Sequence, residues 1–203
     1  MISRSFAFLL SLICPFLIAL PANTASASKG STAPGTYRDW NREIDQVSIL
    51  QTFRLDDYND IAVVSFDTSG VELPNPKDNT YEAVRAAMAS IKPAFLEGFQ
   101  EKLRRKTSPN APRGRGKALI IRVKVVKLDP GSQAARYWVG FGAGAVKIQV
   151  NGDVVDAASH KTLVRFDQER RSAVGAFGGG YSELFARTAR QIGGDIAGLL
   201  NAF

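Results

Sequence analysis

The chain has 203 residues, a formal net charge of +7 at pH 7, one cysteine and one histidine. So few thiol and imidazole groups exclude a disulfide framework and a metal site built from cysteine and histidine ligands. The positive charge favours anionic partners. A basic surface is only a loose electrostatic preference, however, and does not by itself define a binding site.

The first 27 residues have the pattern of a cleavable secretory signal peptide. Arg4 is the only charge before Lys29, an apolar run follows from Phe6 to Leu20, and small residues end the segment at Ala25 and Ala27. We expect cleavage after Ala27 and a periplasmic or extracellular protein. A retained anchor helix is the alternative, but the apolar run is shorter than the roughly 20 residues that cross a bilayer.

The single cysteine, Cys14, lies inside this apolar run and would be the lipidated residue of a lipoprotein. Bulky Ile13 precedes it where a small residue is required, and more apolar sequence follows. These surroundings disfavour a lipid anchor at Cys14. Cleavage after Ala27 would leave a mature chain without any thiol, although its basic charge is still compatible with a peripheral membrane contact.

The composition of residues 28–57 predicts a flexible lead-in, because Ser, Gly, Ala and Pro dominate its start and no firm period follows. Residues 42–53 have the composition for a short helix. The apolar run from Ile61 to Phe66 then predicts a strand buried on both faces. A loop with one glycine and two prolines is expected over residues 67–78.

Two stretches have apolar residues at every third or fourth position and predict long helices. The first stripe consists of Val84, Met88, Ile91, Phe95, Phe99 and Leu103, and the second of Phe185, Ala189, Ile192, Ile196, Leu199 and Phe203. Residues 79–82 have the spacing of a capping box, and Ser182 is a good N-cap for the second helix. Pro93 is expected to kink the first helix.

Between these helices, three stretches alternate apolar and polar residues as strands do. They start near Leu119, Val146 and Thr162, and a hairpin loop at 156–161 joins the last two. A slip of the period at Val125 and Val126 predicts a bulge. The order of elements predicts one α+β domain over residues 58–203. Its sheet should be mainly antiparallel, and the sequence does not decide whether one central strand inserts parallel to its neighbours. Two main helices should pack on one face of this sheet.

Several segments carry a family resemblance: residues 58–66, Asp129 to Ser132, residues 135–144, and the hairpin around 155–163. From Tyr58 to the C-terminus, the chain resembles a family of bacterial exported proteins known as domain of unknown function 4410. The resemblance implies an envelope module that binds other proteins or helps to assemble envelope machinery, and it supplies no catalytic residues. Many relatives are lipoproteins, and this chain departs from them around Cys14.

The glycine-rich and aromatic connection before the strand at Val146 is the candidate binding surface. It comprises Arg136, Tyr137, Trp138, Gly140, Phe141, Gly142 and Gly144. Exposed aromatic residues are common interface anchors, and burial under the terminal helix is the alternative. These glycines precede a strand and do not open a helix, so they lack the context of a nucleotide-binding loop. No cofactor and no metal are expected.

The residues suited to catalysis are few and scattered. His160 and Asp156 belong to the predicted hairpin loop, where positive φ and turn hydrogen bonds account for both residue types. Asp167 and Glu169 alternate with arginines on one strand face, which predicts a solvated surface of cross-strand ion pairs. The basic stretch 104–117 lacks aromatic residues for base stacking, which argues against nucleic acid.

We therefore expect a non-enzymatic protein of the cell envelope, a binding or assembly module that contacts an envelope protein or an anionic envelope polymer. The rival hypothesis is an envelope hydrolase acting on glycan or peptide. That hypothesis requires His160 and a nearby carboxylate to face a shared cleft. The sequence does not determine the oligomeric state.

Overall fold

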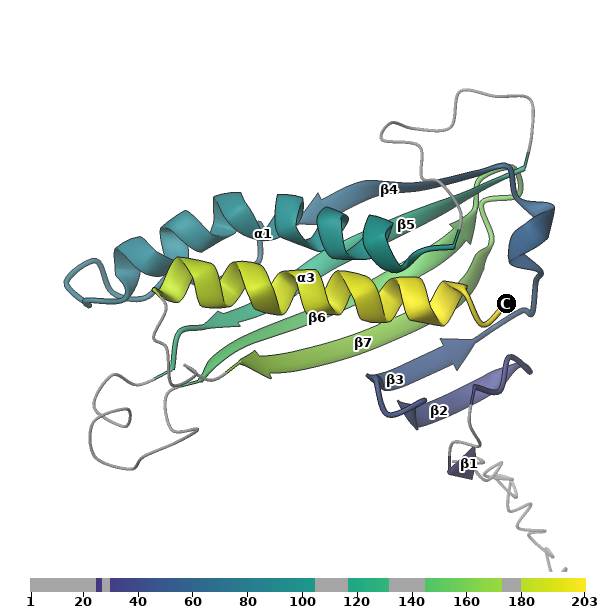
Figure 1. Cartoon of the computed structure of the whole chain (residues 1–203), viewed down its shortest axis with the longest axis horizontal. Coiled ribbons are helices and arrows are strands. Elements are labelled where there is room, and N and C mark those ends of the chain that lie inside the picture. Colours follow the sequence, from purple (N-terminus) through teal and green to yellow (C-terminus); the bar gives the residue numbers. More distant parts are fainter. Residues whose placement is uncertain (1–24, 27–29, 105–116, 132–144, 173–179) are drawn as a thin grey trace, which may run out of the picture.

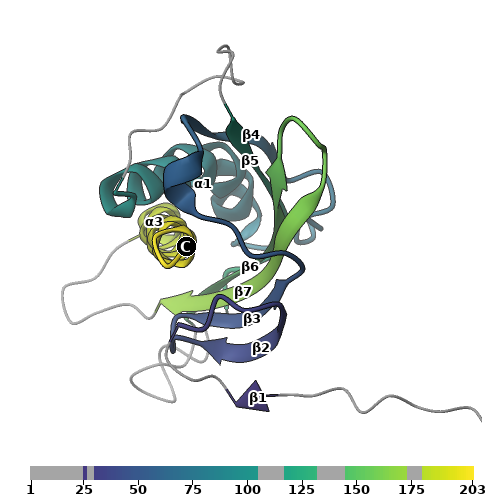
Figure 2. The same ribbon diagram turned by 90° about the vertical axis from the view of Figure 1, so that its right-hand side faces the viewer.

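A computed structural model of the chain describes residues 25–26, 30–104, 117–131, 145–172 and 180–203. Its strands are β1 (Ala25–Ser26), β2 (Gly35–Trp40), β3 (Ile44–Ile49), β4 (Asp60–Asp67), β5 (Ala118–Asp129), β6 (Val146–Asp156) and β7 (Thr162–Ser172). The helices are α1 (Tyr81–Lys102), α3 (Tyr181–Leu200) and the 3-10 turn η1 (Leu55–Asp57). Helices α1 and α3 lie together on one face of a single curved sheet (Figures 1 and 2). The predicted α+β architecture is confirmed.

The strands follow one another across the sheet in the order β1-β2-β3-β7-β6-β5-β4. Strands β5, β6 and β7 form the predicted antiparallel meander, and the β5–β6 register shifts between Val125 and Lys127, where the bulge was predicted. The hairpin between β6 and β7 turns over residues 157–161, also as predicted. Alternation of apolar and polar residues was therefore a sound guide to these three strands.

Strand β4 runs parallel to β5, as the open alternative allowed, but it lies at the edge of the sheet. A parallel neighbour is reached through a crossover, and α1 provides it. Burial on both faces extends only over Ile61 and Ala62, whereas Val64 sits at a β-bulge and is 41% exposed. The expectation of a strand buried on both faces was thus wrong for its second half, because no further strand covers that edge in the described residues.

The expected short helix within 42–53 was also wrong, because Ile44–Ile49 forms strand β3. Residues Asn41 and Arg42 have positive φ and turn the chain between β2 and β3. Strand β3 then pairs with β7 over Val47↔Phe166 and its neighbours. Pairing with a strand far away in sequence overrides the local composition, so this part of the lead-in belongs to the sheet and buries apolar residues in its core.

Strand β1, which pairs with β2 in parallel, lies inside the segment predicted to be cleaved. Helix α1 runs from Tyr81 through Pro93 to Lys102, and its N-cap is Thr80, one residue after the predicted Asn79. The cap of α3 is Gly180, so Ser182 lies within the first turn. No helix in the described part of the chain has the length and apolar content needed to cross a membrane.

Both predicted helical stripes face the core, and the two helices approach each other closely at glycines. A Cβ atom on Gly98 would lie 1.9 Å from the backbone oxygen of Arg190, and one on Gly193 would lie 2.1 Å from the backbone oxygen of Phe95. Only glycine fits at such distances. The close packing leaves α1 and α3 as one layer over the concave side of the sheet (Figure 2).

Candidate functional site

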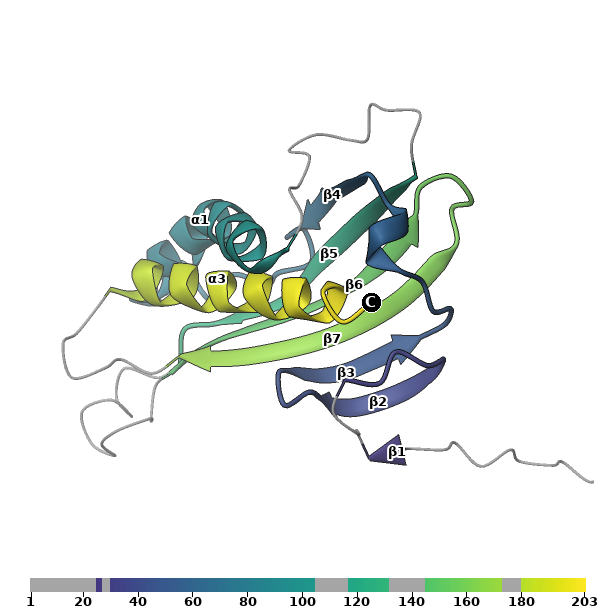
Figure 3. The same ribbon diagram turned by 45° about the vertical axis from the view of Figure 1, so that its right-hand side comes forward.

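The predicted binding surface, Arg136, Tyr137, Trp138, Gly140, Phe141, Gly142 and Gly144, lies outside the described residues. The structure instead shows a polar sheet face that the sequence had indicated only in part. In the described part of the chain, α1 and α3 cover one face of the sheet, and no helix covers the other (Figure 3). We call this second face the open face.

The open face is built from rows of polar residues that run across neighbouring strands. One row consists of Arg38, Gln46, Asp167, Asn151, Lys124 and Asp67, and the next of Thr36, Ser48, Arg165, Asp153, Arg122 and Ser65. The row between them faces the helices and includes Tyr37, Val47, Phe166 and Val123, all of which are buried. Because side chains alternate between the two faces of a strand, alternate residues of the same strands make the core and this polar surface.

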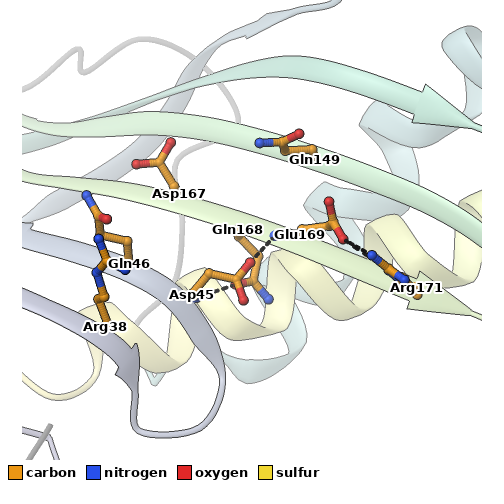
Figure 4. A pocket seen from close by; sticks show the side chains of 8 residues that line it. All are labelled: Arg38, Asp45, Gln46, Gln149, Asp167, Gln168, Glu169 and Arg171. Carbon is orange, nitrogen blue, oxygen red and sulfur yellow. Dashed lines mark hydrogen bonds and ion pairs between the residues drawn. The ribbon is translucent and has the colours of Figure 1, made fainter. Parts of the chain in front are cut away.

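A hollow of about 600 Å³ lies on the open face, where β2, β3, β6 and β7 come together (Figure 4). We call it the polar hollow. Its lining consists of Arg38, Asp45, Gln46, Gln149, Asp167, Gln168, Glu169 and Arg171. Every lining side chain among the described residues is polar, and the volume lies within the range of small-molecule sites in proteins.

At one end of the polar hollow, charges are paired with each other. Glu169 accepts from Arg171 at 3.0 Å and lies 3.4 Å from the ammonium group of Lys147. A carboxylate oxygen of Asp45 accepts a hydrogen bond from the backbone N–H of Glu169 at 2.6 Å, in the position that a strand carbonyl would otherwise take. Farther along β7, Arg165 pairs with Asp153 at 3.4 Å. The predicted surface of cross-strand ion pairs is therefore confirmed for Glu169 and Arg165, but Asp167 has no ion pair among the described residues.

Four lining side chains make no hydrogen bond or ion pair with any described residue. Arg38, Gln46 and Asp167 lie at the other end, whereas Gln149 lies across from Glu169 at the paired end. Arg38 lies opposite Gln46, and Gln46 lies opposite Asp167, on successive strands. Figure 4 shows these three side chains gathered at one end of the hollow. This end therefore offers a guanidinium, a carboxylate and an amide to a ligand.

Beneath the polar hollow, Gln168 connects three elements of the fold. Its amide nitrogen donates to the backbone oxygen of Glu43 at 2.7 Å and to Asp195 at 3.1 Å, and its amide oxygen accepts from the N–H of Asp45 at 3.0 Å. Arg170 binds the same Asp195 carboxylate with two hydrogen bonds of 2.5 and 2.7 Å. The pKa of Asp195 is raised, because the effect of burial outweighs the Arg170 guanidinium, which lowers this pKa. This network fixes the end of the β2–β3 turn at Glu43 and the start of β3, which carries Asp45.

A second, shallower hollow of about 400 Å³ lies where α1, α3 and β7 meet. Its charged groups are already engaged: Arg190 with Glu97 and Glu101, and Arg170 with Asp195. These contacts join elements of the fold to each other. The second hollow therefore has a structural explanation that the polar hollow lacks.

His160 is exposed at the hairpin between β6 and β7 and has φ of 57°, as predicted for a turn residue. Asp156 accepts hydrogen bonds from the N–H and hydroxyl of Ser159, at 2.7 and 2.8 Å, and from the hydroxyl of Tyr58 at 3.0 Å. The N–H of Ser159 is the main cause that lowers the pKa of Asp156. Burial, followed by the bond to Asp156, raises the pKa of Tyr58 to about 12. This carboxylate is thus committed to holding the turn.

The described residues contain no group of three or more histidine or acidic side chains placed to hold a metal ion. Arg38, Gln46, Arg170 and Asp195 were not recognised from the sequence. For Arg38 and Gln46, the missed signal was the alternation of polar Gln46 and Ser48 with apolar Val47 and Ile49, which is typical of a strand.

Comparison with known proteins gives a family but no activity. The family model described as "Domain of unknown function (DUF4410)" matches residues 61–176, more than half of the chain. The chain belongs to this family. The match runs from β4 to just beyond β7 and leaves out β2, β3 and α3. No curated protein matches the chain.

Solved structures with a related outline are distant in sequence. Two crystal forms of a PelC dodecamer from Paraburkholderia phytofirmans, one of them a point variant, are each 12% identical, with TM-scores of 0.38 and 0.39. They cover 74% and 73% of this chain and 96% of their own. Protein XCC0632 from Xanthomonas campestris, of the DUF330 family model, is 15% identical over 68% of this chain and 79% of its own, with a TM-score of 0.37. Family membership therefore rests on the sequence match alone.

Proposed function

We propose that this member of the DUF4410 family is a non-enzymatic binding or assembly module of the cell envelope, which contacts an envelope protein or polymer through its open face. The observation that carries the proposal is the asymmetry of the sheet. In the described part of the chain, one face is sealed by α1 and α3, while the other presents rows of polar side chains and a hollow whose groups are partly unpaired there. Such a face is available for contact without any change in the fold.

Export to the periplasm or the extracellular space is part of the proposal and is supported by the signal-peptide pattern ending at Ala27. The family resemblance to exported proteins points the same way. A non-enzymatic role is supported by the position of His160, which is exposed on a turn while its carboxylate neighbour Asp156 is bound by Ser159 and Tyr58. The hydrolase hypothesis required these two groups to share a cleft.

The test is site-specific photo-crosslinking in intact cells. A benzophenone amino acid replaces Ser48, which lies on the open face outside the polar hollow, and in a matched variant it replaces Gln100, which is exposed on α1. We expect the Ser48 position to capture envelope proteins or cell-wall material and the Gln100 position to capture none. The proposal would be contradicted if both positions captured the same amount of material. It would also be contradicted if the protein, after removal of its signal peptide, crosslinked to cytosolic proteins.

A further inference from the structure

The unpaired end of the polar hollow contains opposite charges that do not reach each other. Arg38 and Asp167 lie on strands separated by β3, with Gln46 between them in the same row. Two strand spacings place their Cα atoms about 9.6 Å apart. Elsewhere on the open face, opposite charges on adjacent strands pair directly, as Arg165 and Asp153 do at 3.4 Å. The hollow therefore holds a separated positive and negative group.

The remaining lining restricts the chemistry of a ligand. Asp45, Asp167 and Glu169 supply three carboxylates, which the guanidinium groups of Arg38 and Arg171 and the Lys147 ammonium group beside Glu169 balance. A lining with both signs of charge does not favour a plain polyanion. A neutral sugar would leave Arg38 and Asp167 without charge partners, and none of the described residues that line the hollow is aromatic and could serve as a stacking platform.

The Cα spacing sets the scale of a ligand that satisfies both ends, although the long Arg38 side chain can adjust the distance between the charged groups. Such a ligand carries a carboxylate and an ammonium group separated by at most about one tripeptide length, since three extended residues span about 10 Å. Its intervening amides match the amide side chain of Gln46, which lies between Arg38 and Asp167 and both donates and accepts hydrogen bonds. The amide of Gln149 lies farther along the hollow, opposite Glu169, and is within the lining that a longer ligand would meet. A guanidinium binds a carboxylate in a bidentate manner, and a carboxylate accepts from an ammonium group.

We propose that the polar hollow binds a short zwitterionic peptide, with the ligand carboxylate on Arg38 and its amino group on Asp167. The inference builds on the proposed function and names the class of ligand that the open face receives. In the envelope, free peptide termini and the peptide parts of the cell wall carry this combination of groups.

The experiment uses protein purified from cells that express the full sequence, labelled with ¹⁵N, and tri-alanine as the probe. We expect tri-alanine to shift the side-chain amide signals of Gln46. Tri-alanine that is both N-acetylated and C-amidated has the same shape without the charges and should leave these signals in place. Arg38→Gln and Asp167→Asn should each weaken binding about tenfold, the usual effect of losing one charge-assisted hydrogen bond.

Matched controls come from the next row of the open face. Arg122→Gln and Asp153→Asn remove the same kinds of charge outside the hollow and should leave the affinity unchanged. All four positions are on the sheet surface, and thermal melting checks that each variant is folded. Equal weakening by the control variants, or equal binding of the blocked peptide, would overturn the proposal. Binding of a neutral N-acetylglucosamine trimer at Gln46 and Gln149, with no response to tri-alanine, would overturn it as well and assign the hollow to glycan.

Failure of this inference can be distinguished from failure of the proposed function. If tri-alanine does not bind but Ser48 still crosslinks to envelope material, only the ligand class is wrong. If tri-alanine binds through Arg38 and Asp167 but Ser48 captures nothing in cells, the hollow keeps its ligand and the envelope role is wrong.

Discussion

Gly193 on α3 faces the backbone of α1 at a distance that no other residue tolerates. In Gly193→Ala, the new Cβ would lie 2.1 Å from the backbone oxygen of Phe95, whereas ordinary contacts begin at 3.4 Å. The helices therefore have to separate by about 1.3 Å locally, because a backbone oxygen cannot rotate away. This separation loosens the packing around Phe95, Phe99 and Ile192, which are fully buried.

The size of the effect follows from two opposing contributions. Overpacking of this kind costs about 3 kcal/mol, at the upper end of its usual range, and the higher helix propensity of alanine returns about 1 kcal/mol. We expect Gly193→Ala to lower the free energy of unfolding by about 2 kcal/mol. In a domain of this size that corresponds to a fall in Tm of about 4–8 °C.

The neighbouring Gly194 supplies the matched control. A Cβ at Gly194 meets only the Lys102 side chain at 3.5 Å and the Gly98 backbone at 3.7 Å, both ordinary contacts. Gly194→Ala should therefore stabilise the protein by up to about 1 kcal/mol through helix propensity. Urea denaturation followed by circular dichroism measures both variants. If Gly193→Ala is at least as stable as Gly194→Ala, the close approach of the helices deduced from the structure is wrong.

Three further substitutions test the interior network and the β6–β7 hairpin. Asp195→Asn should cost about 2 kcal/mol in urea denaturation, less than a fully buried pair because the Arg170 side chain is 32% exposed; an unchanged midpoint would contradict a role for this pair. The pKa of Tyr58 is about 12 when folded, against an ordinary value of 10.0, so the unfolded chain loses this proton first and stability should fall as pH rises from 10 to 12. Tyr58→Phe should remove this loss of stability between pH 10 and 12. It should also remove the tyrosine ionisation near pH 12 from the ultraviolet absorbance titration. If both remain in the variant, the raised pKa does not belong to Tyr58. His160→Gly should leave the fold intact and raise the free energy of unfolding by up to about 1 kcal/mol, because glycine adopts φ of 57° without strain. Thermal melting should therefore show a slightly higher Tm; a lower Tm would show that the imidazole itself is needed.

Local sequence patterns were sufficient for the elements whose burial follows a regular period. Alternation in residues 118–129, 146–156 and 162–172 identified three strands and even the bulge after Val125. Apolar stripes at helical spacing identified α1 and α3 with their buried faces. The hairpin turn at His160 was also accessible, because positive φ is a preference of single residues. Each of these features depends on neighbours in the chain.

The polar hollow depended on contacts that no local pattern contains. Strand β3 was mistaken for a helix because its partner, β7, lies more than 100 residues away, and only their pairing places Gln46 beside Asp167. The same long-range contact brings Arg38 onto the open face and joins Gln168 to Asp45. By itself, the sequence determined which residues avoid water and with what period. Only the tertiary structure decided which polar groups meet, because strand order is chosen by the burial and backbone pairing of the whole sheet.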